Sequence, residues 1–376
     1  MTTMVPARDS LAVSLADVLP SCIASLRGGE NRLSLSPTTA IVVLVVDGLG
    51  SASLRARSAY ARTLTSASGS LWSGFPTTTA AALTTLTTGV LPGQHGLVGY
   101  RVLDTAHDRV VKQLSGWDDR LDPATWQRVP TVFESVPTDE IATYTVGPKR
   151  YANSGLTKAI LRGAVYRSAE SVADRFRAAT SILRAGGRSL TYLYVPELDM
   201  AGHSDGWESD KWSRALENLD GEVRMLVDAL GAGQALLVTA DHGMVDVPAH
   251  KHVLYGHKPE LLAGVRHVAG EPRCLQLHLE PDLGEEARRG LLDAWRAAES
   301  HRSWVVTRSE AIEQGWFGDV APEVEPRIGD VLVAARKGIA YYADEDDKAR
   351  GMIGQHGSWS DDETRVPLLR FGALAD

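Results

Sequence analysis

Acidic and histidine residues recur at three places along the chain where they could bind a metal ion. Asp199 lies four residues before His203, Asp241 and His242 are adjacent, and His356 precedes a glycine near the C-terminus. Zinc and similar first-row ions accept carboxylate oxygens and imidazole nitrogens as ligands. Each motif alone could be a turn or a hydrogen-bonded surface pair. Their combination predicts a metal site.

A threonine-rich segment could provide a nucleophile. Three threonines follow one another in Phe75-Pro-Thr-Thr-Thr-Ala. A hydroxyl is a weak nucleophile at its ordinary pKa, so attack on a phosphate ester requires a base or a metal ion. A helix that begins after Pro76 could also present its first N–H groups to an anion. Helix capping is the ordinary alternative, and the residues alone do not distinguish Thr77, Thr78 and Thr79.

Three apolar runs predict the strands that position these groups: Ala40–Val46, Ser189–Val195 and Ala235–Thr239. The first run ends at Asp47-Gly48, and the other two end shortly before Asp199 and Asp241. Unbroken runs of this kind are typical of the buried strands of a parallel sheet. Because ligands bind beyond the carboxyl ends of such strands, we expect the acidic and histidine residues to converge on one site.

Helical patterns separate these strands. Apolar residues recur at spacings of three and four over Ser168–Ala185 and Asp210–Leu230. Alternating strands and helices predict an α/β fold with a doubly wound, mostly parallel sheet flanked by helices. We assign residues 1–36 to an N-terminal helical segment and residues 37–100, 181–249 and 345–376 to the catalytic core. Residues 101–180 and 250–344, which contain polar turns and shorter strand-like runs, are predicted to form inserted caps.

Charge and cysteine content narrow the expected partners. The net charge of -8 disfavours nucleic acid polymers, whereas a small anionic substrate could bind where metal ions dominate the local field. Cys22 and Cys274 are expected to be core residues and suit a reducing compartment. No apolar run is long enough to span a membrane and no leader peptide is evident, so we expect a cytoplasmic protein without a membrane partner. The sequence indicates no oligomeric state.

Six dispersed motifs resemble the alkaline phosphatase superfamily. The branch they resemble most is the nucleotide pyrophosphatase/phosphodiesterase (type I phosphodiesterase) group, which is itself similar to phosphonoacetate hydrolases. The resemblance runs from about residue 40 to about residue 360. Its motifs are Val46-Asp47-Gly48, Phe75-Pro-Thr-Thr-Thr, Thr88-Gly89 with His95-Gly96, Asp199 with His203, Asp241-His242-Gly-Met244, and His356-Gly357.

The resemblance implies a metal-dependent phosphoric ester hydrolase with two divalent ions, expected to be Zn²⁺. In that family the nucleophile stands ten residues before the glycine of the Thr-Gly pair, and counting back from Gly89 gives Thr79. Thr79 would attack phosphorus and form a phosphothreonine intermediate, which water then releases. The resemblance implies two ligand sets, the first being Asp199, His203 and His356, and the second Asp47, Asp241 and His242.

The sequence departs from the nucleotide pyrophosphatases at one position. Those enzymes carry an asparagine eleven residues after the same glycine, where it helps to bind the phosphoryl oxygen, and Tyr100 stands there in this chain. The Tyr100 hydroxyl could donate a hydrogen bond instead, and Arg101 could supply charge. Lys149 and Arg150 are further candidates to bind a distal phosphate or carboxylate of a small phosphate-ester substrate.

Several alternatives follow from the same residues. A phosphomonoesterase or a phosphonoacetate hydrolase-like enzyme would use the same site, and a non-catalytic, metal-stabilised protein could bind an anion there. The segment Asp47-Gly48-Leu49-Gly50 is a poor match to a dinucleotide-binding loop, because Ser53 occupies the third glycine position. Sulfatases are disfavoured because Pro-Thr-Thr-Thr lacks the modified Cys or Ser of their Cys/Ser-x-Pro-x-Arg motif.

Overall fold

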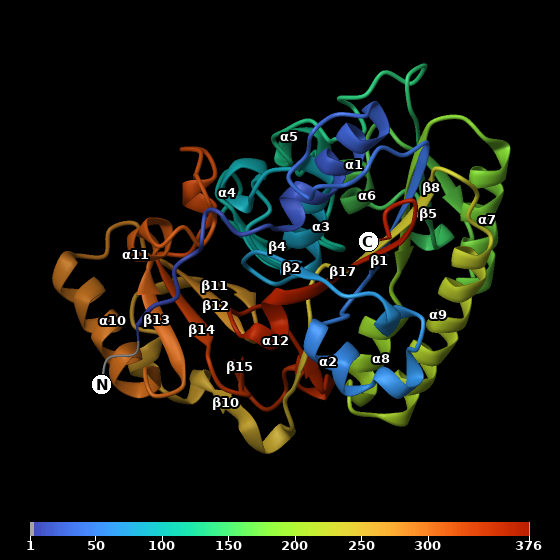
Figure 1. The fold of residues 1–376 in the computed structure, drawn as a ribbon. Helices are drawn as coiled ribbons and strands as arrows, with labels where there is room; N and C mark the ends of the chain where they lie inside the picture. Colours follow the sequence, from blue (N-terminus) through green and yellow to red (C-terminus); the bar gives the residue numbers. More distant parts are fainter. Residues whose placement is uncertain (1–3, 376) are drawn as a thin grey trace.

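The computed structural model describes residues 4–375, in which two β-sheets lie side by side with helices packed around them (Figure 1). In this part of the chain the main sheet has seven strands, in the order β2-β17-β8-β1-β7-β5-β6. Strands β8, β1, β7, β5 and β6 are parallel, while β17 runs antiparallel to both of its neighbours. The strands are β1 (Ala40–Val46), β2 (Ser70–Trp72), β5 (Ala142–Gly147), β6 (Val165–Ser168), β7 (Ser189–Val195), β8 (Gln234–Thr239) and β17 (Arg365–Gly372).

Helices cover both faces of the main sheet. One face packs against α7 and α9, while α1, α3 and α6 lie on the other side (Figure 1). Every residue of β1 is buried, as expected for a central strand covered on both faces. The predicted α/β fold with a mostly parallel sheet is therefore confirmed. The helices are α1 (Val18–Arg27), α3 (Thr79–Thr88), α6 (Gly155–Ile160), α7 (Val172–Ala185) and α9 (Asp210–Asp228).

The second sheet is antiparallel and has six strands within the described residues, in the order β13-β14-β12-β11-β3-β4. Helix α10 packs near β13, and this half of the protein lies beside the main sheet (Figure 1). Its elements are β3 (Arg101–Asp104), β4 (Arg109–Lys112), β11 (Val265–Glu271), β12 (Cys274–Leu279), β13 (Ser303–Thr307), β14 (Val331–Ala335), α10 (Glu285–Glu299) and α11 (Arg308–Glu313).

Short elements complete the chain. Two small strand pairs connect loops outside the two large sheets. The pairs are β9 (Val245–Asp246) with β16 (Gly354–Gln355), and β10 (His252–Leu254) with β15 (Ala340–Tyr342). The remaining helices are α2 (Ser51–Ala56), α4 (Pro92–His95), α5 (Pro123–Trp126), α8 (Glu197–Asp205) and α12 (Asp361–Thr364).

The boundary of the first predicted cap differs from the arrangement in the structure. Residues 101–180 were assigned to a cap, yet β5 pairs with β7 and β6 pairs with β5 in the main sheet. Polar and aromatic residues interrupt both strands, which read ATYTVG in β5 and VYRS in β6. Neither strand therefore has the unbroken apolar run that marks β1. Residues 250–344 contribute most of the second sheet. That residues 250–344 act as a cap over the site stays a prediction.

The N-terminal segment is partly helical, and its α1 contains Pro20 within the first turn, where a missing N–H does not break a helix. Residues 1–3 of the predicted segment 1–36 lie outside the described part of the chain. Cys22 and Cys274 are both buried free thiols. No helix among the described residues is long and apolar enough to cross a lipid bilayer.

A buried ion pair joins the second sheet to the loops at the edge of the main sheet. Arg273, in the turn between β11 and β12, donates two hydrogen bonds of 2.7 Å to Glu363 of α12. The Glu363 carboxylate also accepts the Ser358 N–H at 2.9 Å, and its backbone carbonyl accepts the Gly243 N–H at 2.8 Å. Arg273 and Glu363 side chains are 1% and 0% exposed. The carboxylate and the backbone carbonyl of Glu363 together connect this residue to three separate segments.

Removing the arginine should therefore destabilise the protein strongly. We expect Arg273→Met to lower the free energy of unfolding by about 3–5 kcal/mol, because Glu363 would remain buried without its partner. Arg27→Met is the matched control, since the Arg27–Glu140 pair is 43% and 34% exposed and solvent should screen most of its contribution to stability. Urea denaturation of both variants measures the difference, and equal losses would show that burial does not set the strength of the Arg273 pair.

Candidate active site

The carboxyl ends of three parallel strands bring the predicted site residues together. The register pairs Val46 with Val195 and Val45 with Thr239, so β1, β7 and β8 end at nearly the same level. Asp47 directly follows β1, α8 after β7 carries Asp199, and Asp241 follows β8. The predicted convergence at this edge of the sheet is present in the structure.

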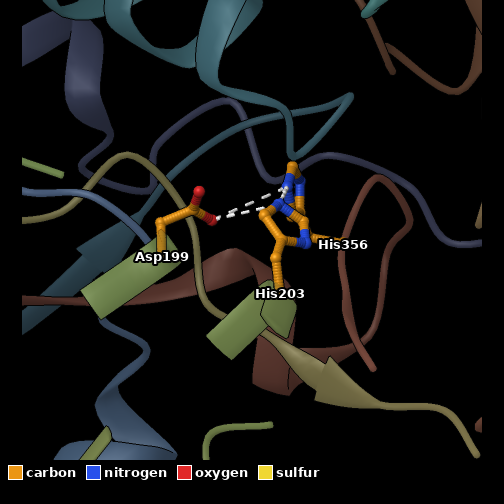
Figure 2. A group of neighbouring side chains, drawn as sticks. All are labelled: Asp199, His203 and His356. Atoms are coloured by element: carbon orange, nitrogen blue, oxygen red, sulfur yellow. Dashed lines mark hydrogen bonds and ion pairs between the residues drawn. The ribbon is translucent and has the colours of Figure 1, made fainter. Parts of the chain in front are cut away.

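The first group of side chains consists of Asp199, His203 and His356 (Figure 2). Asp199 Oδ1 lies 3.3 Å from His203 Nε2 and 4.0 Å from His356 Nε2, and the two imidazole Nε2 atoms are 3.3 Å apart. Asp199 and His203 project from the same side of α8, as their spacing predicts. His356 arrives from a distant part of the chain because β16 pairs with β9 close to α8.

The second group surrounds His242. Its Nε2 lies 3.3 Å from Asp241 Oδ2, 3.5 Å from Asp47 Oδ1 and 3.1 Å from Thr79 Oγ1. Asp199 also belongs here, because one ligand atom each from Asp47, Asp199 and His242 lie within 4.8 Å of one another. Asp199 therefore stands between the two groups, a position that its sequence spacing does not reveal. The His242 and His356 rings stack at 3.7 Å between centroids.

Backbone carbonyls orient all three imidazoles. The Nδ1 atoms of His203, His242 and His356 lie 2.7, 3.1 and 2.7 Å from the carbonyl oxygens of Gly354, Gly243 and Thr77. A carbonyl can only accept a hydrogen bond, so each Nδ1 carries the proton and each Nε2 keeps its lone pair. This arrangement is the usual support for metal-ligating histidines.

The start of α3 distinguishes the three threonines. Thr79 is the first residue of the helix, and its hydroxyl faces His242. Thr78 caps the helix, and its hydroxyl is directed toward Glu271. The Thr77 hydroxyl donates to the Ser358 carbonyl at 2.8 Å and accepts the Gly357 N–H at 3.0 Å. Only the Thr79 hydroxyl therefore lies against the predicted ligands.

The donor atoms present are suited to divalent cations. Asp47 Oδ1, Asp199 Oδ1 and Asp241 Oδ2 are buried and have no hydrogen-bond partner among the described residues. A buried carboxylate oxygen without a partner is strongly disfavoured unless a cation or a donor meets it. These oxygens lie among imidazole Nε2 atoms with free lone pairs, which is a donor set typical of zinc.

Burial dominates the electrostatics of the site. Burial and the charge of Asp47 raise the pKa of Asp199 to about 8, and burial and the charge of Asp199 raise the pKa of Asp241 to about 7. Burial lowers the pKa of His242 to about 3. Protons and metal ions therefore compete for the same carboxylates, while His242 is available as a neutral ligand.

The four predicted substrate-binding residues lie around the site but do not contact its ligands. The Tyr100 N–H donates to Glu271 Oε2, and Arg101 Nε donates to the Gly270 carbonyl, both at 3.3 Å. Arg150 stacks on the ring of Tyr151 at 4.7 Å and donates to Met200 Sδ, next to Asp199 in sequence. Lys149 occupies the same 3₁₀ turn. Their substrate roles stay predictions.

A tyrosine-rich cavity beside Thr79 was not anticipated from the sequence. It has a volume of about 150 Å³ and is lined by Thr79, Asp47 and Asp199 together with four tyrosines, Tyr151, Tyr166, Tyr192 and Tyr194. The Tyr194 hydroxyl donates to Asp47 Oδ2 and so orients that carboxylate. One signal was available: Tyr192 and Tyr194 alternate within a predicted strand, so both must face the same side of the sheet.

A family profile identifies the chain. The profile of type I phosphodiesterases/nucleotide pyrophosphatases matches residues 41–359. The chain belongs to this family. It is therefore a phosphoester hydrolase of the alkaline phosphatase superfamily, and its family is metal-dependent. The predicted family is confirmed.

Solved structures share the fold of this type I phosphodiesterase family member. An inactive variant of murine ectonucleotide pyrophosphatase/phosphodiesterase 5 in complex with AMP has a TM-score of 0.67 and 15% identity, over 89% of this chain and 88% of that one. Phosphonoacetate hydrolase from Sinorhizobium meliloti 1021 in complex with phosphonoacetate has a TM-score of 0.68 and 17% identity, over 91% of each chain. At these identities the likeness shows the fold alone.

A partial likeness extends to one curated protein. Phosphopentomutase from Anaeromyxobacter dehalogenans (strain 2CP-C) is 30% identical over 128 residues. The match spans 33% of this chain and only 30% of the length of that relative. It therefore assigns no activity to this chain.

The raised carboxyl pKa values predict how zinc binding depends on pH. Between the ordinary aspartate pKa of about 4 and the values of about 7 and 8 at Asp241 and Asp199, these two carboxyl groups bind more protons in the folded metal-free protein than in the unfolded chain. Their contribution to stability should therefore fall as pH rises through this window. Zinc binds the deprotonated carboxylates, so zinc should raise the melting temperature more at pH 8 than at pH 6.

Differential scanning fluorimetry with and without zinc at both pH values measures this effect. Asp199→Asn is the control, because the substitution removes one titrating carboxylate and should weaken the pH dependence. A zinc-induced shift that is equal at both pH values, or larger at pH 6, would show that these carboxylates do not bind the ion.

Proposed function

We propose that this chain is a two-zinc phosphodiesterase or nucleotide pyrophosphatase in which Thr79 is the nucleophile. The observation that carries the proposal is the position of the Thr79 hydroxyl, at the first turn of α3 and 3.1 Å from His242 Nε2. This hydroxyl also lines the cavity that Asp47 and Asp199 border. The Thr79 hydroxyl, the two clusters of proposed ligand atoms and the cavity are therefore adjacent, which supports the proposal.

The ligands divide into two proposed sets. Asp199, His203 and His356 would hold one ion, and Asp47, Asp241 and His242 would hold the other, with Asp199 close to both. The bound ions would supply positive charge that activates the hydroxyl and offsets the negative charge of the phosphoryl oxygens. The small donor clusters and the net charge of -8 support a small phosphate ester as the substrate, rather than a nucleic acid polymer.

The residues of the chain would act in two displacements. Thr79 Oγ1 loses its proton to solvent and forms a bond to phosphorus while the bond from phosphorus to the leaving oxygen breaks. The leaving oxygen takes up a proton from solvent, and a phosphothreonine remains. Water then attacks the same phosphorus, and the bond to Thr79 breaks. The first backbone N–H groups of α3 have no partner within the helix and would face the phosphoryl oxygens. Tyr194, through its hydrogen bond to Asp47, is a positioning residue.

Substrates with other leaving groups could react at the same proposed ligands and nucleophile. Phosphomonoesters and phosphonoacetate are alternative substrates, since the ligand sets and Thr79 do not select among them. Turnover of bis-4-nitrophenyl phosphate, 4-nitrophenyl phosphate, a thymidine monophosphate 4-nitrophenyl ester and phosphonoacetate should be compared under identical conditions. We expect the diesters to be hydrolysed with the highest kcat/KM. A metal-stabilised binding protein would hydrolyse none of the four.

Replacing the nucleophile should separate chemistry from metal binding. Thr79→Ala should lower kcat for bis-4-nitrophenyl phosphate by at least about 1,000-fold, because the hydroxyls of the neighbouring Thr77 and Thr78 are directed away from the ligand clusters. The variant should still bind two zinc ions per chain by elemental analysis, since Thr79 lies outside both proposed ligand sets. Thr88→Ala, at the far end of the same helix, is the matched control and should retain activity. Substantial turnover by Thr79→Ala would assign the attack to another group.

A further inference from the structure

The start of α3 lacks the cap bond that a threonine at this position usually makes. Thr78 is the N-cap residue of α3 and has the extended backbone conformation of a capping residue, yet its hydroxyl accepts no hydrogen bond from the helix. Four other helices begin with a serine or threonine whose hydroxyl accepts the backbone N–H three residues further on at 3.0–3.2 Å, namely Ser154, Ser171, Ser209 and Thr307. The Thr78 hydroxyl is thus held in another direction.

Two backbone N–H groups lack a partner as a result. Ala80 and Ala81 are the second and third residues of α3, and they precede Ala82, whose N–H donates to the Thr78 carbonyl at 2.9 Å. The N–H groups of Ala80 and Ala81 have no acceptor within the described part of the chain, and both residues are buried. Buried N–H groups rarely stay unpaired. They are available to an anion that binds beside Thr79.

A buried glutamate of the second sheet accounts for the direction of the Thr78 hydroxyl. Glu271 is the last residue of β11 and is 3% exposed, and the Thr78 hydroxyl is directed toward it. Glu271 Oε2 accepts the Tyr100 N–H at 3.3 Å, whereas Oε1 has no hydrogen-bond partner among the described residues. A buried carboxyl oxygen without a partner attracts a nearby hydroxyl. Glu271 therefore competes with the helix for Thr78.

The loop after His356 confines the Glu271 side chain. Gly357 has a positive φ of 131°, and a Cβ atom at this position would overlap Glu271 Cγ. The Gly357 N–H donates to Thr77 Oγ1 at 3.0 Å, which fixes this loop against the segment before α3. Glu271 consequently lies between the loop that carries His356 and the turn that carries Thr79. It has little space to turn away from Thr78.

The electrostatics of Glu271 are compatible with an anion at the start of α3. Burial raises the pKa of Glu271 to about 8, so its carboxyl group carries little negative charge at pH 7. A charged carboxylate in the same place would repel a bound phosphate, whereas a mostly neutral one orients Thr78 without strong repulsion.

We propose that Glu271 is a positioning residue that holds the Thr78 hydroxyl away from the helix and so keeps the N–H groups of Ala80 and Ala81 free for a phosphoryl oxygen. Thr78 would otherwise cap α3 and occupy one of these N–H groups itself. The inference rests on the proposed function, in which the start of α3 faces the phosphoryl group. It assigns a role to a residue that lines no part of the cavity beside Thr79 and belongs to neither proposed ligand set.

A rescue experiment tests this inference on the zinc-loaded protein, with inorganic phosphate as the probe. Glu271→Met keeps the length of the side chain but removes both carboxyl oxygens. The Thr78 hydroxyl should then cap α3, and the affinity for phosphate should fall by at least about tenfold. Valine cannot accept a hydrogen bond. The double variant Glu271→Met/Thr78→Val should therefore regain an affinity within about threefold of that of Thr78→Val alone. Isothermal titration calorimetry measures all four proteins.

Two further variants separate this role from a general loss of stability. Glu299→Met is the matched control, because Glu299 is a second buried glutamate that accepts hydrogen bonds from Arg302 and Tyr341. It should lower stability and leave the phosphate affinity of the folded protein unchanged. Glu271→Gln, which can still hold the Thr78 hydroxyl, should bind phosphate within about threefold of the unaltered protein, and a tenfold loss would contradict the inference. This variant provides a test even if Glu271→Met does not fold.

A crystal structure of Glu271→Met gives a readout that needs neither turnover nor a ligand. Thr78 Oγ1 should lie at hydrogen-bond distance from the N–H of Ala80 or Ala81, and a hydroxyl that still points away from the helix would overturn the inference. The inference is also wrong if the double variant binds phosphate as weakly as Glu271→Met, or if Glu271→Met binds it as tightly as the unaltered protein. Failure of the proposed function looks different: the unaltered protein would hydrolyse no ester, while the phosphate affinities and the position of Thr78 would still follow the expected order.

Discussion

Three carboxylates buried at one edge of a parallel sheet constrain the rest of this structure. Asp47, Asp199 and Asp241 each leave one oxygen without a hydrogen-bond partner among the described residues. A carboxylate removed from water loses several kcal/mol of hydration that only opposite charge or hydrogen bonds can replace. Three imidazoles with unprotonated Nε2 atoms face the same space, so the chain itself provides lone pairs there and no fixed positive charge. Divalent cations would supply the missing positive charge to the carboxylates and would accept the lone pairs of the imidazoles.

The loops around these carboxylates need support from elsewhere in the chain. Thr77 joins the segment before α3 to the loop after His356, and Glu363 joins that loop to Gly243, which follows His242. Arg273 extends the network to the second sheet. The second sheet thus contributes to the site without supplying any proposed ligand, because it holds the segments that carry His242 and His356 in place.

The sequence allowed the central strands to be predicted closely and the flanking ones poorly. Strands β1 and β7 have the predicted bounds, and β8 begins one residue earlier, since strands buried on both faces are uninterrupted apolar runs. Residues 101–180 were assigned to a cap because of their polar turns, and Thr143, Tyr144 and Thr145 leave β5 without the apolar run that marks β1. Thr145 is polar where it borders the cavity. The polar residue that borders the cavity thus made β5 hard to recognise as a strand. The alternating Tyr192 and Tyr194 of β7 were the remaining indication of where the cavity lies.

The site itself was predictable in composition but not in its internal distances. All six predicted ligands and Thr79 come together, while the position of Asp199 between both groups depends on how three strand ends meet in space. Anomalous X-ray diffraction at the zinc absorption edge, on crystals of the zinc-loaded protein, tests the proposed pair of ions directly. Two peaks are expected, one bounded by Asp199, His203 and His356 and the other by Asp47, Asp241 and His242. A single peak, or peaks away from these side chains, would contradict the two-ion site.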